Sequence, residues 1–176
     1  NQSEYAKILQ QSCDRLLNTV NDIIEVSKIE SGEVKISNVN VDIIEFVQST
    51  VLFFKPETDK KNLDVIFENT LETPILTIET DLSKLNSIIS NIFKNAIKYT
   101  SQGHIKIRIA KNESDLLIAI NVSGEGIEKD KINKIFDRFD RGGLDEYQNK
   151  EGAGLGLSIV KSYVEMLGGR IDVEST

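Results

Sequence analysis

The sequence has very few of the residues that build metal centres and disulfides. Its 176 residues include 1 Cys, 1 His, 2 Pro and no Trp. A single Cys excludes an internal disulfide, and one Cys with one His excludes a zinc site of the Cys/His type. A Ser-His-Asp triad would have to use His104, which has no flanking nucleophile motif. The composition therefore disfavours zinc proteins and serine hydrolases.

Long hydrophobic runs and excess positive charge are also missing. No apolar stretch approaches the ~18 residues of a membrane span, and the start shows no signal-peptide pattern. The formal net charge of -7 disfavours nucleic acid and anionic lipid as main partners. We therefore expect no nucleic-acid or membrane contact by this chain. Because Asn1 stands in place of an initiator Met, we expect the sequence to be a piece of a longer protein.

A long amphipathic helix is predicted over roughly the first 30 residues. Apolar or small side chains recur there at spacings of three and four: Leu9, Cys13, Leu16, Val20, Ile23 and Ser27. Such a stripe is typical of the seam of a helical bundle, and Gly32 is a stop signal. One helix cannot bury its own stripe. Its partner would come from another chain or from preceding sequence; the alternative is packing on its own domain.

The rest of the chain mixes helices with short strands. After a polar linker we predict helices over residues 43–54, 82–99, 128–136 and 155–167, the first ended by Pro56. Asp42 and Asp81 are the expected N-caps of the first two. Strands are predicted at 63–67, 76–78, 105–109, 116–122 and from 170, with a loop at 137–151. This order favours an α+β fold, with helices packed on one face of a mixed, largely antiparallel sheet.

One face of the predicted helix 82–99 is polar although the helix is otherwise core-like. Lys84, Asn91, Asn95 and Lys98 fall on that stripe. Asparagine oxygens can bind a hard cation such as magnesium, which usually arrives with phosphate oxygens, and Lys98 could neutralise that phosphate. The alternative is an ordinary solvated face.

Two glycine clusters favour the phosphate interpretation. Residues 123–127 (SGEGI) follow a strand, and residues 152–157 (GAGLGL) open a helix. Glycine lets the backbone approach a ligand closely, and a helix N-terminus presents free N–H groups to phosphate. The second cluster fits neither the dinucleotide-binding fingerprint nor the P-loop, because Leu157 replaces the third glycine and no Gly-Lys-Ser/Thr follows.

Taken in order, four segments resemble the N, G1, F and G2 boxes of sensor histidine kinases: residues 91–100 (NIFKNAIKYT), 124–127 (GEGI), 135–139 (IFDRF) and 152–157. The resemblance covers essentially the whole chain. It implies a Bergerat-type α/β sandwich preceded by one long bundle helix. Residues 1–32 would be the second helix of the dimerisation hairpin, 33–41 a linker, and 42–176 the ATP-binding catalytic domain without its last strand.

The same resemblance implies ATP and Mg²⁺ as ligands and gives roles to individual residues. Asn95 would ligate magnesium beside Asn91, and Asn91 and Lys98 would be catalytic. Phe136 and Phe139 would hold the base of a lid over residues 140–151. The implied ATP-binding set is Asn91, Asn95, Lys98, Tyr99, Val122, Gly124, Gly126, Ile127, Arg141, Gly152, Gly154, Leu155, Gly156 and Leu157. Arg138 and Arg141 are either phosphate or interdomain contacts, or plain surface residues.

Three positions depart from the family pattern. His104 lies at a surface hairpin and is expected to be a bystander, so the phosphoacceptor His would precede Asn1 and the chain alone should not autophosphorylate. Val122 stands where the family carries an aspartate that binds the adenine amino group. Losing that bond should lower ATP affinity roughly 10- to 150-fold unless neighbours compensate. Ala153 replaces the usual Ser/Thr, with a smaller expected effect.

The implied function is transfer of the ATP γ-phosphoryl group to a His outside this sequence and onward to a response regulator aspartate. The implied partners are a second copy, through the helical hairpin, and a receiver domain, in a cytoplasmic protein whose parent could be anchored to the cell membrane. One alternative is a degenerate regulatory module, favoured by Val122. Another is an ATP-driven clamp or hydrolase; Asn91 counts against it, because an amide cannot act as the general base.

Overall fold

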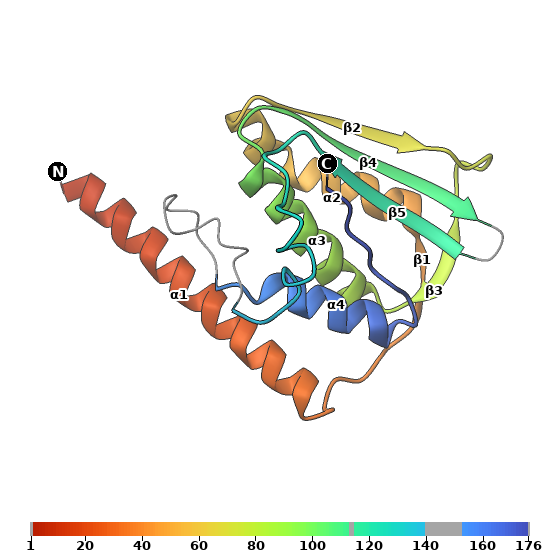
Figure 1. The fold of residues 1–176 in the computed structure, drawn as a ribbon, viewed down its shortest axis with the longest axis horizontal. Helices are drawn as coiled ribbons and strands as arrows, with labels where there is room; N and C mark the ends of the chain where they lie inside the picture. The colour runs from red at the N-terminus through yellow and green to blue at the C-terminus, as the bar shows by residue number, and fades with distance from the viewer. Residues whose placement is uncertain (1, 113–114, 140–152, 176) are drawn as a thin grey trace.

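The computed structural model describes residues 2–112, 115–139 and 153–175. Along the chain lie α1 (Gln2–Glu30), β1 (Val39–Asp42), α2 (Ile43–Lys60), β2 (Leu63–Asn69), β3 (Thr77–Thr80), α3 (Leu82–Tyr99), β4 (Gly103–Asn112), β5 (Asp115–Val122) and α4 (Gly156–Met166). In Figure 1 a sheet is covered by α2 and α3, α4 lies against α3, and α1 is a long rod beside α4. The predicted long first helix and α+β class are confirmed. None of the described helices is both long and apolar enough to span a membrane.

The main sheet is mixed and has the order β2-β4-β5, with β2 parallel and β5 antiparallel to the central β4. A separate antiparallel pair joins β1 to β3. In the main sheet Ile105 pairs with Val122 and Ile107 with Ile120. Directly paired residues share a face, and Ile105 and Ile107 are fully buried under the helices. Val122 therefore belongs to the helix-facing side of the sheet.

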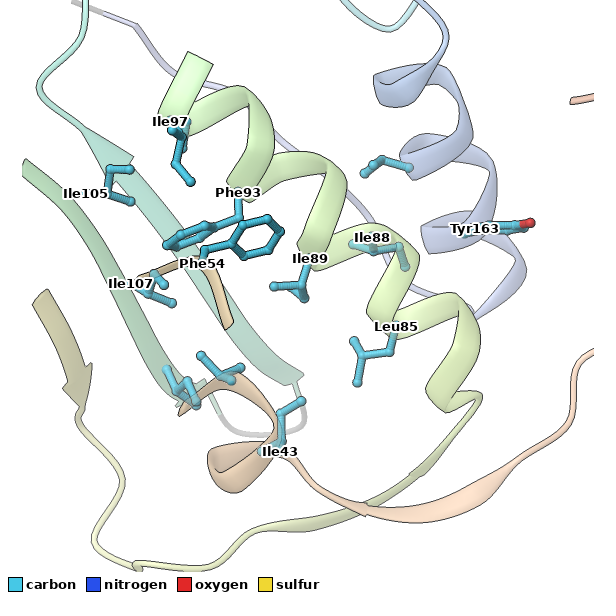
Figure 2. Packing of buried hydrophobic residues seen from close by; sticks show 14 of the residues in the cluster. Ile43, Phe54, Leu85, Ile88, Ile89, Phe93, Ile97, Ile105, Ile107 and Tyr163 are labelled. Atoms are coloured by element: carbon cyan, nitrogen blue, oxygen red, sulfur yellow. The ribbon is translucent and has the colours of Figure 1, made fainter. Parts of the chain in front are cut away.

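The core lies between this sheet face and the helix layer. Phe54 of α2 and Phe93 of α3 stack with ring centroids 5.2 Å apart and an interplanar angle of 30° (Figure 2). Both rings are fully buried, as are the inward isoleucines of β4. Burying side chains of this size stabilises the fold by roughly 1.5–3 kcal/mol each, so α3 is held by its apolar side and its polar side is left for other contacts.

Two aspartates begin the central helices, as predicted. Asp42 accepts from the Ile44 N–H at the start of α2. Asp81 accepts from the Ser83 and Lys84 N–H groups at 2.9 and 3.0 Å, and its second oxygen accepts from the Ser37 N–H at 2.8 Å. Burial alone would raise the pKa of Asp81, but these hydrogen bonds outweigh it and lower the pKa to about 2. The cap thus also fixes the segment after α1 to the start of α3.

The prediction that Pro56 ends its helix is wrong, because α2 continues to Lys60 with Pro56 inside it. The proline removes the hydrogen bond to the Leu52 carbonyl one turn earlier. Leu52 and Phe53 are exposed, so this carbonyl lies on the solvent side, where water can replace the missing donor. On the opposite side Phe54 and Thr58 are buried, and their packing carries the helix past the proline.

Two further sequence predictions are wrong. Residues 128–136 form successive turns rather than a helix, with hydrogen bonds such as Lys131 N–H to Glu128 O and Lys134 N–H to Lys131 O. Bonds three residues apart alternate there with bonds four residues apart, such as Ile132 N–H to Glu128 O, so no regular helical ladder forms. Residues 170–173 form no strand: Ile127 N–H donates to the Ser175 hydroxyl at 2.8 Å, a side-chain contact in place of a backbone ladder.

Candidate nucleotide-binding site

The polar stripe of α3 is half-buried rather than solvated. Asn91, Asn95, Lys98 and Tyr99 are all partly covered. The Asn91 amide donates to the Ser87 carbonyl at 2.9 Å, one turn earlier, which turns its oxygen away from the helix backbone. Lys84 does not join this group, because its ammonium lies 5.3 Å from the centre of the Tyr163 ring on α4. The predicted stripe is therefore shortened to its second half.

The glycine segment before α4 lies directly against Asn91. A Cβ atom on Gly156 would be 2.9 Å from the Asn91 side-chain oxygen, so only glycine fits without a shift. Leu155 is buried and anchors the helix start, and no side chain caps it. The first N–H groups of α4 are therefore available beside an amide ridge, which is suitable for binding an anion. Gly154 has φ +72°, a conformation that favours glycine.

The other glycine segment lies at the far end of α3. A Cβ on Gly124 would be 2.6 Å from the Tyr99 carbonyl oxygen and 3.3 Å from the Thr100 hydroxyl. Gly126 has φ +75°. The positions that contact the two segments, Asn91 and Tyr99, are eight residues apart, about 12 Å along a helix. The fold thus places Gly156 against the Asn91 side chain and Gly124 against the C-terminal end of α3.

The remaining predicted residues add few polar groups. Val122 ends β5, is 44% exposed and adds no polar group. Ile127 and Leu157 are half-buried. The Lys98 ammonium donates to the Tyr99 hydroxyl at 2.8 Å. Arg141, Gly152 and the lid at 140–151 lie outside the described residues.

The segment around Phe139 connects the site to α1. The Phe139 N–H donates to the Gly154 carbonyl at 3.0 Å, while the Phe139 side chain is 68% exposed. Arg138 forms an ion pair with Glu30 at the end of α1. Of the alternatives left open by the sequence, Arg138 therefore makes the contact with the long helix.

A second contact joins α1 to the helix layer. The Tyr163 hydroxyl of α4 donates to the Glu25 carboxylate at 2.5 Å. Burial and this carboxylate raise the pKa of Tyr163, so the hydroxyl keeps its proton and remains a donor.

Sequence reasoning missed two residues that shape the site. The Lys61 ammonium donates to the Ile97 carbonyl at 2.5 Å and lies near the Lys98 and Thr100 carbonyls, so it closes the C-terminal end of α3. Ser123 binds the backbone at the start of β4. No sequence pattern marked either residue. The Lys61 contact joins positions 36 residues apart, and a serine beside a glycine is ordinary in turns.

The chemistry of the site is that of amide oxygens, one ammonium and backbone N–H groups. Among the described residues no group of three or more His, Cys, Asp or Glu is placed to hold a metal ion. Neutral amides bind a divalent cation weakly by themselves, so a cation here would have to be shared with ligand phosphates. A face closed by two glycine segments over amides is the arrangement of a nucleotide-binding domain.

The comparison with family models identifies the class. The chain belongs to the family of histidine kinase-, DNA gyrase B- and HSP90-like ATPases, whose model matches residues 80–176. Its fold is accordingly the Bergerat-type α/β sandwich expected from the four boxes. The matched region includes α3, both glycine segments and α4, which are the elements that build the site.

The relatives are sensor kinases. The sensor protein GacS of Pseudomonas syringae pv. syringae is 30% identical over 99% of this chain, and ArcB of Escherichia coli, an aerobic respiration control sensor, is 32% identical over 99%. The chain spans 20% and 22% of their lengths. The structure of full-length ShkA in complex with AMPPNP has a TM-score of 0.80 at 26% identity, covering 95% of this chain and 34% of ShkA.

A second solved structure is that of the histidine kinase ThkA in complex with the response regulator protein TrrA. It has a TM-score of 0.74 at 25% identity and covers 96% of this chain and 46% of ThkA. The predicted recognition of a histidine kinase-type ATP-binding domain is confirmed.

Proposed function

We propose that this chain binds MgATP and presents its γ-phosphoryl group to a histidine outside the sequence, from which it passes to an aspartate of a response regulator. The observation that carries the proposal is Gly156 against Asn91, where a single methyl group would collide with the amide oxygen. This close contact joins an open helix N-terminus, which suits phosphate, to the amide ridge.

Individual roles follow from position along α3. Asn95, one turn after Asn91, would ligate Mg²⁺ together with the phosphates, and the cation would neutralise their charge. Asn91 would lie beside this cation with its oxygen as a possible ligand, while the N–H groups of Gly156 and Leu157 would donate to the phosphate oxygens. The Lys98 ammonium would give up its hydrogen bond to the Tyr99 hydroxyl and approach the phosphates or the ribose. The Gly124 segment would contact the nucleoside end.

The chemistry favours phosphoryl transfer over hydrolysis. The Asn91 amide has no useful basicity and already donates to Ser87, so it cannot activate water. Transfer to a side chain needs mainly positioning and charge neutralisation, which these residues would supply together with a bound cation. Residues 1–32 would act as the second helix of a dimerisation hairpin, 33–41 as a linker and 42–176 as the catalytic domain.

The rival proposal is a regulatory module whose ATP binding is impaired, and Val122 is the residue that favours it. Its side of the sheet faces the helix layer, where the strand offers no polar group to a ligand. Isothermal titration calorimetry with ATP, with and without Mg²⁺, separates the two. Magnesium-dependent binding at micromolar to submillimolar concentration supports the kinase. Absence of binding supports the module.

The variant Val122→Asp sharpens this test. A charged acceptor at the nucleoside end contributes about 1.5–3 kcal/mol, so ATP affinity should rise roughly 10- to 150-fold. GTP is the matched control, because a carboxylate offers nothing to its 6-oxo group. If the affinities for ATP and GTP rose equally, the new carboxylate would not be acting on the base.

A further inference from the structure

The hydroxyl of Ser123 attaches the second glycine segment to the beginning of β4. It accepts from the His104 N–H at 2.8 Å and lies 3.3 Å from the His104 carbonyl and 3.5 Å from that of Gln102. The Ser123 N–H also donates to the His104 carbonyl at 3.1 Å. Backbone and side chain of one residue therefore bind the same short stretch, one position beyond the end of β5.

Gly103 makes room for this hydroxyl. Its φ of +109° favours glycine, and a Cβ there would lie 2.2 Å from the Ser123 oxygen. No real pair of atoms tolerates that distance, so any other residue at 103 would expel the hydroxyl. Gly103 and Ser123 are thus matched to each other across 20 residues, and the backbone conformation at 103 requires glycine as well.

The next residue, Gly124, has no room for a side chain. Gly124 lies so close to α3 that a Cβ would be 2.6 Å from the Tyr99 carbonyl. The place where Ser123 is fixed therefore decides how the segment 124–126 lies on the end of α3. Ser123 is an exposed residue, yet its hydroxyl is engaged with backbone and not free for a ligand.

We propose that Ser123 is a positioning residue for the nucleotide, acting through the 124–126 segment and requiring Gly103 as its partner. This inference rests on the proposed function, because it concerns the same ligand. Ser123 does not touch the ligand itself; it holds the backbone that does.

The first experiment measures MgATP affinity by calorimetry for wild type, Ser123→Ala and Ser123→Thr. We expect about a tenfold loss for the alanine variant, the effect of one backbone-anchoring hydrogen bond, and a change below about twofold for threonine, which keeps the hydroxyl. The control is Thr73→Val, since the Thr73 hydroxyl binds the Ile75 backbone in a turn outside the site. It should leave affinity unchanged.

A double-mutant cycle tests the coupling. Gly103→Ala alone should weaken ATP binding by at least tenfold, because the new methyl group displaces the hydroxyl. In the Ser123→Ala background the part of the loss caused by the hydroxyl should disappear, since the nearest remaining atom would be the residue 123 Cβ at 3.2 Å, while the backbone strain of alanine at φ +109° would remain. Effects that multiply independently would overturn the proposal, as would threonine failing to rescue.

Melting temperatures of all variants distinguish a loss of ATP binding from a loss of stability. A wild type that binds no nucleotide would contradict the proposed function itself. A wild type that binds, with Ser123→Ala binding equally well, would contradict the positioning role alone. A loss of affinity that merely follows the melting temperature across Thr73→Val and Ser123→Ala would assign the hydroxyl a purely structural role, also against the proposal.

Discussion

At the scale of single residues, the absence of a side chain matters as much as its presence. Gly156 and Gly124 each lie where a Cβ would meet an atom of α3 at 2.9 and 2.6 Å. Sequence alone cannot separate such glycines from those of ordinary turns. Gly168, for example, has φ +77° but open space around it, so its requirement is purely conformational.

Replacing Gly156 by Ala should weaken MgATP binding by roughly tenfold, because the new methyl group would displace the Asn91 oxygen, now 2.9 Å away, from its position beside the ligand. Gly169→Ala is the matched control, since a Cβ there would meet a Val164 methyl group at 3.3 Å and the Val164 carbonyl oxygen at 3.5 Å, neither of them in the site. Calorimetry gives the affinities. Equal losses in both variants would mean that the close approach of α4 to Asn91 is unimportant.

At the scale of elements, Asp81 and Pro56 affect the stability of α3 and α2. Asp81 caps α3 and also binds the Ser37 N–H. We expect Asp81→Ala to cost about 1–2 kcal/mol of unfolding free energy, whereas Asp81→Asn, which can still cap, should cost less. Urea denaturation at neutral pH measures both. Equal losses would show that capping is not the main contribution.

The pH dependence of this cap has a definite sign. The Asp81 pKa is about 2 in the folded chain against a reference value of 3.8. Its charge therefore stabilises the fold above pH 3.8, and this contribution is lost as the pH falls toward 2. The stability difference between wild type and Asp81→Asn should shrink over that interval. A difference that stays constant in urea titrations from pH 5 to pH 2 would rule out the charged cap.

Pro56 is the second element-scale feature. Replacing it with Ala restores the donor to the Leu52 carbonyl, and we expect about 2 kcal/mol of added stability: about 3 kcal/mol from helix propensity, less up to about 1 kcal/mol from the looser unfolded chain. Thermal and urea unfolding measure it. Glu57→Ala, an exposed neighbour, should change stability little, and a destabilised Pro56→Ala would mean that the ring packs against something important.

At the scale of the whole molecule, α1 is the least covered part. Leu9, Leu16, Leu17, Val20 and Ile23 are between 44% and 67% exposed, whereas Val26 and Ile29 near its end pack against the core. We expect this face to pair with a second copy, and Leu16→Glu with Val20→Glu to shift sedimentation from dimer to monomer. Because these residues contribute little to the fold of one chain, melting of the ATP-binding domain should not change. Asn18→Glu, on the polar face, is the control and should stay dimeric.

The sequence by itself determined the class of fold, the caps and the order of the boxes, because these depend on local patterns: alternation in β4 and β5, the aspartates before α2 and α3, glycines at element ends. It failed where distant contacts decide. Burial of Phe54 and Thr58 carries α2 past Pro56, and the Ile127 N–H bonds the Ser175 hydroxyl 48 residues away where the sequence predicts a strand.

Only the tertiary structure decided which polar residues share the site. In the folded chain Lys84 lies over the Tyr163 ring, Arg138 pairs with Glu30, and Lys61 binds the carbonyls at the end of α3. It also paired Gly103 with Ser123 and Gly156 with Asn91. The physical reason is that such contacts join segments tens of residues apart, and their distances are set by packing of the sheet and helices, which no local pattern encodes.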